Sequence, residues 1–435
     1  MLLKFETGNY KIFESRISFS MIPAPKQKGL DYSILGKTIG GKPYKALCSS
    51  VIYGPNAAGK TNIIGAMQAF KNIILRGNIR NADPVNSPNT ADFALEVIPN
   101  NTLKERKDVF FSIHFIHDGV SVKYSLSMDI GFFLEVNYDR SITEEILEIN
   151  GKEFFRRTTD ALDFNPSMKY FEKFLIADYV KNSKAATAIA RSSLNKTDLF
   201  LMNGFKTIVS SSLVNLISEY FTEQFITVYH ADIVGMFPVF RKQMARDKLL
   251  DEAVSAFGVK ANKLVYYKDK NNNNTPMLGS VIGSENKKGI MPAELFESYG
   301  TVRFTYMYPL LVSAMISGAT IIIDEFDASI HPMAIMNIIN IFHNDEINKN
   351  NAQLIFNTHN PLYLNNNLFR RDEIKFVDRD DETMCSKLYS LSDFGTKGTN
   401  ARKGKDYMNN YFINEYGAIK DIDFTEVFRK IIEES

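Results

Sequence analysis

An eight-residue segment with the sequence GPNAAGKT, at residues 54–61, fits the pattern G-x-x-x-x-G-K-[ST]. Backbone N–H groups of such a loop can cradle phosphates, because glycine permits the close approach and the unusual dihedral angles that this needs. Lys60 would reach the β and γ phosphates of a nucleotide, and the Thr61 hydroxyl would hold a Mg²⁺ ion. The predicted contacts come from Gly54, Asn56, Gly59, Lys60 and Thr61.

Two adjacent carboxylates, Asp324 and Glu325, follow the apolar run Thr320–Ile323. Asp324 would hold the hydration shell of the Mg²⁺ ion, and Glu325 would polarise an attacking water as general base. Taken alone, such a pair is as consistent with a solvated turn as with a hydrolytic site. Three neighbouring motifs favour the hydrolytic site.

These motifs lie on both sides of the carboxylates. Upstream, Ser298 and Gly300 lie at the start of an apolar helix, and a serine hydroxyl, a glycine N–H and a helix N-terminus together form a second anion site. Downstream, Asp327 lies in the loop that leads to the next helix. His359 follows the predicted strand Gln353–Asn357, at the carboxyl end of a strand, where open α/β sheets place ligand chemistry.

Strands and helices must position these groups. The run Ser49–Tyr53 reads as a short buried strand that ends at the glycine loop. After the loop, apolar residues recur with the i, i+3, i+4, i+7 spacing of an amphipathic helix. They are Ile63, Ala66, Met67, Phe70, Ile73 and Ile74. Strand, glycine loop and helix N-terminus occur in the order that phosphate binding requires.

Residues 304–323 form an uncharged run with the length of a membrane span. Pro309, the pair Ser317-Gly318 and the β-branched residues 320–323 divide this run into a helix and a buried strand. Because that strand delivers Asp324 and Glu325, we interpret the run as core beside the nucleotide. We therefore expect no membrane association.

The order of these motifs resembles the ABC-type ATPases, in the branch that includes the RecF, SMC and Rad50 proteins. The forms S-x-G-T-x-R, I-D-E-F-D-x-S-x-H-P and T-H-N-P-L are closer still to the OLD (overcoming lysogenisation defect) ATPases and to bacterial AAA-labelled ATPases of abortive-infection (anti-phage) systems. The opening NYKIF at residues 9–13 is also similar to that group. The resemblance implies an α/β fold: an ABC-type P-loop ATPase head with a mixed central sheet, flanking helices and an antiparallel β lobe.

The resemblance also implies a head-to-tail homodimer, or a higher homo-oligomer, with ATP between the glycine loop of one subunit and the Ser-x-Gly turn of the other. Ser298 and Gly300 would contact the γ-phosphate of nucleotide bound to the other subunit, and Asp327 would cross the interface. His359 would sense the γ-phosphate or position water, and Lys11 would lie near the nucleotide.

Two further positions of the family concern an arginine and a glutamine. Arg303 matches the family's arginine, for which a structural role supporting the helix is the alternative. The glutamine-loop residue of the family cannot be assigned within residues 83–96.

About 240 residues separate the glycine loop from Ser298, which is more than a connection between two motifs needs. Alternating apolar and polar residues from about 92 to 157 predict antiparallel strands, and the pattern from about 166 to 257 is helical. Residues 264–267 and 277–282 predict a β-hairpin. We therefore expect an N-terminal ATPase lobe (1–160), an inserted helical domain (161–260) and a C-terminal ATPase lobe (261–435). Sustained heptads are absent, so no long coiled-coil arm is expected.

The composition of the chain limits which partners it can bind and indicates where in the cell it is found. The chain has 435 residues, with 51 Lys and Arg against 50 Asp and Glu, so nucleic-acid binding would have to rest on a local basic patch. Two cysteines permit no disulfide framework and fit a reducing cytosol. The N-terminus lacks the apolar region of a signal peptide, and we expect a cytoplasmic protein.

Two functional hypotheses remain open. The first is an ATP-hydrolysing sensor or scaffold subunit of a bacterial anti-phage system that controls a separate effector protein. The second is a RecF- or Rad50-like repair ATPase that binds DNA through a basic strip. The candidates for that strip are Arg241, Lys242, Arg246, Lys248, Lys287 and Lys288, which are also explained as a solvated face. The acidic run at residues 378–381 imitates a TOPRIM nuclease site, but a polar hairpin turn is the favoured interpretation.

Overall fold

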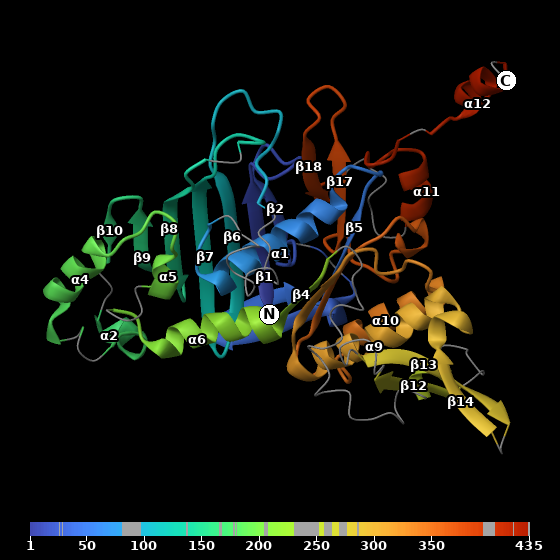
Figure 1. Cartoon of the computed structure of the whole chain (residues 1–435), viewed down its shortest axis with the longest axis horizontal. Coiled ribbons are helices and arrows are strands. Elements are labelled where there is room, and N and C mark those ends of the chain that lie inside the picture. Colours follow the sequence, from blue (N-terminus) through green and yellow to red (C-terminus); the bar gives the residue numbers. More distant parts are fainter. Residues whose placement is uncertain are drawn as a thin grey trace.

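The computed structural model describes residues 1–25, 27, 29–80, 97–135, 138–164, 168–176, 179, 181–203, 208–229, 252–255, 263–268, 276–284, 287–394, 405–420 and 422–433. Two large β-sheets dominate these residues, one in each half of the molecule (Figure 1). Helix α1 (Lys60–Arg76) runs between the two sheets. The helices α9 (Tyr299–Ser317) and α10 (Pro332–His343) cover the opposite face of the sheet that contains the strand Ser49–Tyr53.

The first sheet is antiparallel, in the order β10-β9-β8-β7-β6-β1-β2. Its strands are β1 (Leu2–Gly8), β2 (Ile17–Ser20), β6 (Val109–His117), β7 (Val120–Asp129), β8 (Ser141–Ile149), β9 (Lys152–Thr158) and β10 (Leu162–Asp163). The strands expected between residues 92 and 157 are present and extend a sheet that begins with β1.

The second sheet has the order β11-β15-β16-β5-β17-β18, and every pair in it is parallel except β17 with β18. Its strands are β5 (Ser49–Tyr53), β11 (Phe225–Val228), β15 (Thr320–Ile323), β16 (Gln353–Asn357), β17 (Ile374–Arg379) and β18 (Ser386–Ser390). Parallel strands bring their carboxyl ends to one edge of the sheet. The expected mixed sheet with flanking helices and an antiparallel β lobe is confirmed.

Successive residues of each buried strand serve two different cores. Ile52, Ile322 and Ile355 pack with α1 and the antiparallel sheet, whereas Val51 and Ile321 pack with α9 and α10. This alternation follows from the two-residue period of a strand. Burial on both faces explains why these strands read as continuous apolar runs.

Gln353 joins the two sheets at its side-chain amide. Its Oε1 accepts from the Leu2 backbone N–H and the Thr320 hydroxyl, and its Nε2 donates to the carbonyl oxygens of Leu2 and Leu47. The side chain is fully buried, so these four hydrogen bonds replace its contacts with water. The first strand of the chain is thereby tied to a strand that begins 351 residues later.

The predicted helical segment, 161–260, is helical only in part of its described residues. It contains α2 (Met168–Phe171), a 3₁₀ turn (Glu172–Phe174), α4 (Ser183–Ser192), α5 (Phe200–Asn203), α6 (Ser211–Glu219) and a π-helical turn (Tyr220–Gln224). The chain then enters β11, which pairs with β15 at the edge of the parallel sheet. The helical interpretation was wrong for β11, because a short segment with three apolar residues directly after a helix continues the helical pattern without a break.

The uncharged run 304–323 is the greater part of α9 followed by β15, as expected. Helix α9 continues through Pro309 and ends at Ser317, where Gly318 adopts a left-handed conformation (φ 69°). No helix in the described part of the chain is long and apolar enough to cross a membrane.

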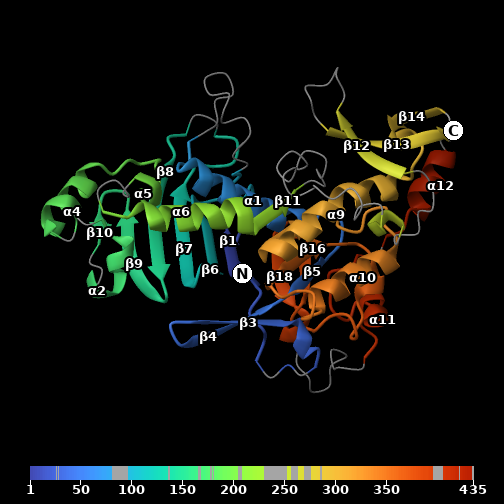
Figure 2. The same cartoon turned by 90° about the horizontal axis from the view of Figure 1, so that it is seen from below.

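Smaller elements project from this body (Figure 2). They include the hairpin β3 (Ile34–Ile39) with β4 (Lys42–Leu47), and a three-stranded sheet of β12 (Lys263–Lys268), β13 (Pro276–Ser284) and β14 (Lys287–Pro292). The expected pairing of 264–267 with 277–282 is present, and β14 adds a strand. Short 3₁₀ turns are Asp31–Ser33, Ala293–Leu295, Pro361–Tyr363 and Leu391–Asp393.

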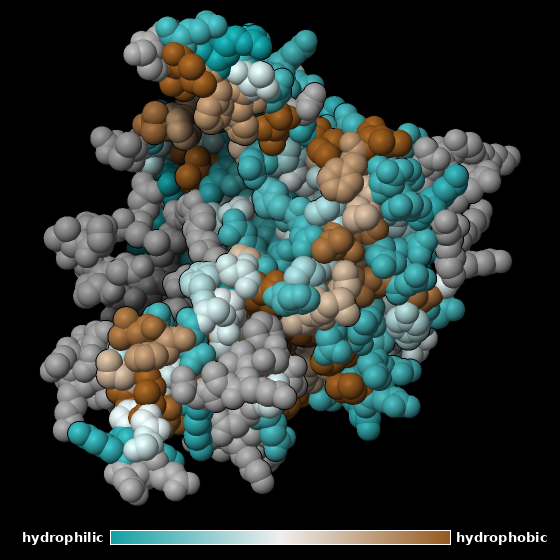
Figure 3. Space-filling view, turned by 90° about the vertical axis from the view of Figure 1, so that its right-hand side faces the viewer, coloured by the Kyte–Doolittle hydropathy of each residue, from teal (hydrophilic) through white to brown (hydrophobic). Residues whose placement is uncertain are grey.

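The C-terminal part carries two helices, α11 (Tyr407–Phe412) and α12 (Thr425–Glu433). Tyr407 and Tyr411 of α11 are buried in the second core, whereas α12 buries none of its residues. Helix α12 stands away from the body (Figure 1), and apolar side chains are exposed on it (Figure 3).

Candidate nucleotide-binding site

The glycine loop connects the carboxyl end of β5 to the start of α1, as predicted. Gly59 is the residue before α1 and has a φ of 108°, which favours glycine. A Cβ atom there would lie 2.3 Å from Ile12 Cδ1. The segment that contains Lys11 and Ile12 therefore packs directly on the loop, and the positive φ at Gly59 favours glycine there.

Lys60 lies over its own loop. Its Nζ donates hydrogen bonds to the carbonyl oxygens of Gly54 (2.8 Å) and Pro55 (3.0 Å). Burial lowers the pKa of the Lys60 ammonium to about 8, and the nearby carboxylates of Asp324 and Glu325 oppose that shift. The ammonium is thus held where phosphates would meet the loop.

The glycine loop and the acidic strand end are in direct contact. The Thr61 hydroxyl donates to Asp324 Oδ1 at 2.9 Å, and the Asn357 amide donates to the same oxygen. Asp324 is buried, whereas Glu325 next to it is exposed. Glu325 has a φ of 50°, a left-handed conformation that is uncommon for residues other than glycine.

A hollow of about 230 Å³ opens beside these groups. Predicted site residues account for most of its lining. The lining residues are Asn56, Ala57, Gly59, Lys60, Thr61, Asn62, Glu325, Asn357 and His359. The sequence did not predict Ala57, Asn62 and Asn357 as site residues. The polar residue that follows three apolar residues at the carboxyl end of β16 was the available signal for Asn357.

His359 lies at this hollow, two residues beyond the end of β16. Burial lowers the pKa of His359, and the charge of Lys60 lowers it further against the opposing carboxylates of Glu325 and Asp327. Its imidazole is therefore mainly neutral at pH 7. A neutral imidazole can accept a hydrogen bond at one nitrogen and donate one at the other.

Asp327 faces the interior of its own chain. Its Oδ2 accepts a hydrogen bond from the Thr358 hydroxyl at 2.8 Å, and burial raises the pKa of its carboxyl. Because Thr358 precedes His359, the aspartate loop is joined to the histidine segment. The predicted contact of Asp327 across a subunit interface stays a prediction.

Ser298 and Gly300 are brought together at the start of α9. The Ser298 hydroxyl caps the helix by accepting from the Thr301 N–H at 3.2 Å. A Cβ atom on Gly300 would lie 2.1 Å from the Ser329 carbonyl oxygen, so only glycine allows this approach to the aspartate loop. Neither residue lines the hollow described above.

Lys11 and Arg303 make contacts around the site. The Lys11 Nζ donates to the Tyr229 hydroxyl at 3.1 Å, just after β11. Arg303 is buried, and its Nη2 donates to the Glu325 carbonyl oxygen at 2.6 Å. Arg303 thus supports the turn at Glu325 as well as the helix α9. Residues 83–96, where a glutamine loop was sought, lie outside the described residues.

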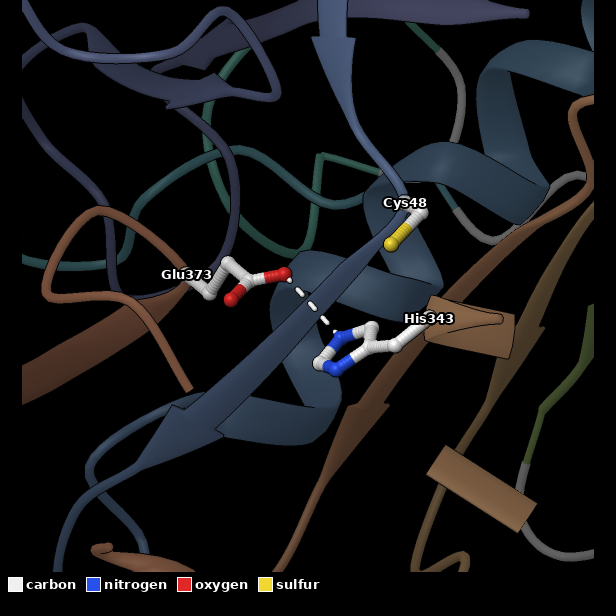
Figure 4. Close-up of side chains that lie close together, drawn as sticks. All are labelled: Cys48, His343 and Glu373. Atoms are coloured by element: carbon white, nitrogen blue, oxygen red, sulfur yellow. Dashed lines mark ion pairs between the residues drawn. The ribbon is translucent and has the colours of Figure 1, made fainter. Parts of the chain in front are cut away.

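A second polar cluster lies at the opposite, amino-terminal ends of β5 and β17 (Figure 4). The ligating atoms of Cys48, His343 and Glu373 lie within 4.8 Å of one another, and all three residues are buried. The Ser49 hydroxyl donates to Glu373 Oε1 at 2.9 Å and lies 2.7 Å from His343 Nε2. His343 Nε2 also lies 3.3 Å from Glu373 Oε1, whereas its buried Nδ1 has no hydrogen-bond partner among the described residues. We interpret the cluster as a polar part of the core in which Ser49, His343 and Glu373 interact.

The acidic run at residues 378–381 forms the end of β17 and the start of the turn to β18. Asp380 Oδ1 accepts hydrogen bonds from the backbone N–H groups of Glu382 and Thr383 and from the Thr383 hydroxyl. The preferred interpretation as a hairpin turn is therefore confirmed.

The fold and the motifs together define an ABC-type P-loop ATPase head. Residues 49–365 match the family described as "AAA domain, putative AbiEii toxin, Type IV TA system". The matched segment is most of the chain, and the chain belongs to this family. The expected relation to AAA ATPases of abortive-infection systems is thereby confirmed. A comparison with curated proteins gave no significant match.

Several solved structures are similar to this chain. One is an SMC head bound to the C-terminal winged-helix domain of ScpA (TM-score 0.44, 11% identity, covering 91% of this chain and 98% of that one). A second is the SMC head domain from Thermotoga maritima (TM-score 0.37, 11% identity, 89% and 98% coverage). A third is the Pyrococcus furiosus SMC head with an extended coiled coil, bound to the C-terminal domain of ScpA (TM-score 0.38, 12% identity, 89% and 96% coverage).

Proposed function

We propose that this chain binds ATP with Mg²⁺ and hydrolyses it to ADP and phosphate. The observation that carries this proposal is the 2.9 Å hydrogen bond between Thr61 Oγ1 and Asp324 Oδ1, which joins the glycine loop to the acidic strand end. Hydroxyl and carboxylate oxygens are ligands that suit Mg²⁺, directly or through its waters. Mg²⁺ would neutralise charge on the phosphates when bound there.

The other residues of the hollow would bind the phosphates and activate the attacking water. The loop N–H groups around Gly54, Asn56 and Gly59 and the ammonium of Lys60 would hold the phosphates. Glu325 is exposed to the hollow and would take a proton from the attacking water. His359, neutral at pH 7, would position that water or contact the γ-phosphate.

We propose that a complete site is formed by two subunits, and that the hollow of one chain supplies only one side of it. Ser298, Gly300 and the N-terminus of α9 form an anion-binding turn away from the hollow of the same chain. In a head-to-tail dimer or higher assembly, this turn would cover the γ-phosphate bound to another subunit. Asp327 and Lys11 would lie near that interface.

Glu325→Gln tests the hydrolytic role. The substitution removes the general base but keeps the size of the side chain, so we expect ATP binding to persist and turnover to fall by about 10²–10⁴-fold. Lys60→Ala should instead lose ATP binding. Calorimetric binding and phosphate release would be measured for both variants. Wild-type turnover in the Glu325→Gln variant would contradict the assigned role.

Mixing two inactive variants tests the shared site. Lys60→Ala removes one glycine loop, and Ser298→Arg blocks one Ser-x-Gly turn. In a head-to-tail heterodimer both defects fall in one site, and the second site is intact. We therefore expect the mixture to hydrolyse ATP although neither variant does so alone. Continued inactivity of the mixture would contradict the head-to-tail arrangement.

At the cellular scale, we propose a cytoplasmic sensor or scaffold subunit of an anti-phage system, in which nucleotide-driven closure controls a separate effector protein. The description of its family, which names a putative toxin of a type IV toxin–antitoxin system, supports this role. A pull-down from the native host, with the Glu325→Gln variant and ATP, should recover the effector. If the pull-down recovers no stable partner protein, either with ATP or without it, the result would count against the proposal.

A DNA-binding ATPase is the second candidate. Lys287 and Lys288 are exposed at the start of β14, on the small sheet that packs against α9 through the Tyr266 hydroxyl. The other candidate basic residues, Arg241, Lys242, Arg246 and Lys248, lie outside the described residues. ATP-dependent DNA binding that weakens steeply with salt, and weakens less steeply in a Lys287→Ala, Lys288→Ala double variant, would favour this candidate.

A further inference from the structure

One buried amide, that of Asn357, contacts both acids at the end of β15. Its Nδ2 donates to Asp324 Oδ1 at 2.5 Å, and its Oδ1 accepts from the Glu325 backbone N–H at 2.6 Å. Asn357 is 1% exposed and is the last residue of β16. Ile323 pairs with Phe356 in the parallel ladder, so the register places Asn357 opposite Asp324.

The contact with Glu325 fixes an unusual backbone conformation. A φ of 50° is strained at a residue other than glycine and persists only where its surroundings hold it. Asn357 binds the N–H of Glu325, and Arg303 binds its carbonyl oxygen at 2.6 Å. The peptide groups on both sides of Glu325 are thus held, and its side chain lines the hollow.

The contact with Asp324 fixes a carboxylate. Asp324 Oδ1 accepts from Asn357 on one side and from the Thr61 hydroxyl on the other. Two donors on the same oxygen set the orientation of the carboxylate relative to the glycine loop. A single side chain therefore touches the residue that would hold Mg²⁺ and the residue that would activate water.

We propose that Asn357 is a positioning residue for hydrolysis, which orients Asp324 toward the metal and aims Glu325 at the attacking water. This inference rests on the proposed ATPase function. Asn357 acts through the two acids, so its loss should affect kcat and the Mg²⁺ requirement more than the KM for ATP.

Two variants separate the two contacts. Asn357→Asp keeps an acceptor for the Glu325 N–H but replaces the donor to Asp324 with a second carboxylate oxygen, whereas Asn357→Ala removes both contacts. We expect kcat to fall by about 10–100-fold in both, as for other residues that orient metal ligands. In Asn357→Asp, the half-saturating Mg²⁺ concentration for binding of a fluorescent ATP analogue should also rise at least about tenfold.

Asn348 offers a matched control. It is a buried amide in the turn before β16, and it makes hydrogen bonds to Phe342 and Ala352 far from the hollow. Asn348→Ala should lower the melting temperature without changing kcat or the Mg²⁺ requirement. Asn357→Ser keeps a short donor and acceptor, so its kcat should be higher than that of Asn357→Ala. This variant also tests the proposal if the other Asn357 variants do not fold.

The outcomes separate the two proposals. A folded wild-type chain that binds ATP without hydrolysing it would overturn the proposed hydrolysis, and the Mg²⁺ titration would still test Asn357. Unchanged kcat and Mg²⁺ dependence in the folded Asn357 variants would overturn the positioning role. Equal losses in Asn348→Ala would also overturn it, because the effect would then come from general destabilisation of β16.

Discussion

Lys60 shows how the surroundings of one side chain set its chemistry. Its ammonium is largely buried and donates to two carbonyl oxygens of its own loop. Burial lowers its pKa to about 8, although two carboxylates lie nearby. Phosphates would favour the charged form, so nucleotide binding and proton uptake by Lys60 should be linked.

This linkage predicts that ATP binds more weakly at alkaline pH. Above pH about 8 the free protein loses the Lys60 proton, whereas the complex retains it. The affinity should then fall by up to about tenfold per pH unit, and it should be nearly constant between pH 7 and 7.5. Calorimetric titrations at pH 7, 8 and 9 would measure the change.

Lys60→Arg provides the control for this pH dependence. An arginine remains charged throughout this range, so any binding retained by the variant should not weaken between pH 7 and 9. If its affinity falls as steeply as that of the wild type, Lys60 is not the group responsible.

At the residue scale, the sequence predicted the groups that belong to motifs. Lys60, Thr61, Glu325 and His359 line one hollow although they come from three separate segments. Asn357 was missed, because an asparagine at a strand end has no motif, and its role depends on the register between β15 and β16. Asp327 was found, but its inward hydrogen bond to Thr358 depends on a loop conformation that spacing does not reveal.

At the element scale, a buried ion pair attaches the helical segment to the antiparallel sheet. The Glu145 carboxylate on β8 accepts hydrogen bonds from the backbone N–H groups of Phe200 and Leu201. Its Oε2 lies 3.7 Å from Nε of Arg157 on β9. Arg157 in turn donates to the carbonyl oxygens of Asp198 and Asn195. Residues 195–201 are therefore held by two side chains that are almost completely buried.

Glu145→Gln should destabilise the protein strongly. It leaves the Arg157 charge buried without its partner, and it places an amide N–H₂ against backbone donors, so we expect a loss of about 3–5 kcal/mol in the free energy of unfolding. Denaturant titration would measure this loss. Proteolysis should also become faster near residues 195–201.

Glu148 is a control on the same strand. It pairs with Lys123 at the surface, at 2.7 Å, with both side chains partly exposed. Glu148→Gln should change the free energy of unfolding by less than about 1 kcal/mol. Similar losses at Glu145 and Glu148 would contradict the anchoring role of the buried pair.

The elements were predicted best where a strong pattern coincided with a motif. The strand β5, the helix α1 and the hairpin of β12 with β13 follow from apolar spacing and from their flanking turns. Strand β11 was missed because its short apolar sequence is compatible with both a helix and a strand. Only its pairing with β15 decides between them.

For the whole molecule, α12 is separable from the ATPase body. Six exposed apolar residues lie on or just before it, and none of its residues is buried. They are Ile422, Phe424, Val427, Phe428, Ile431 and Ile432. Deletion of residues 421–435 should therefore leave the melting temperature and ATP affinity unchanged, as measured by thermal unfolding and calorimetry.

A longer deletion, of residues 405–435, should behave differently. It also removes α11, whose Tyr411 packs against Tyr53 of β5 and Phe376 of β17. Loss of such buried aromatic side chains costs about 3–5 kcal/mol each, so the melting temperature should fall markedly. Equal stability of the two deletions would contradict this assignment of the C-terminal boundary.

The arrangement of the whole molecule was the hardest level to predict. The N-terminal lobe expected at residues 1–160 supplies β5 to the centre of the parallel sheet, between strands from the C-terminal part. Motifs identify the strands that meet at the nucleotide site, but they do not reveal that the two sheets enclose α1.

The Gln353 amide has a consequence for synthesis of the chain. During translation the Leu2 backbone and the Leu47 carbonyl are made early, and their shared partner leaves the ribosome only after more than 350 residues have been added. Strand β5 also cannot pair until its neighbours in the sheet, β16 and β17, have been synthesised. The parallel sheet therefore forms late, and nascent chains carry unpaired apolar strands that chaperones can bind until then.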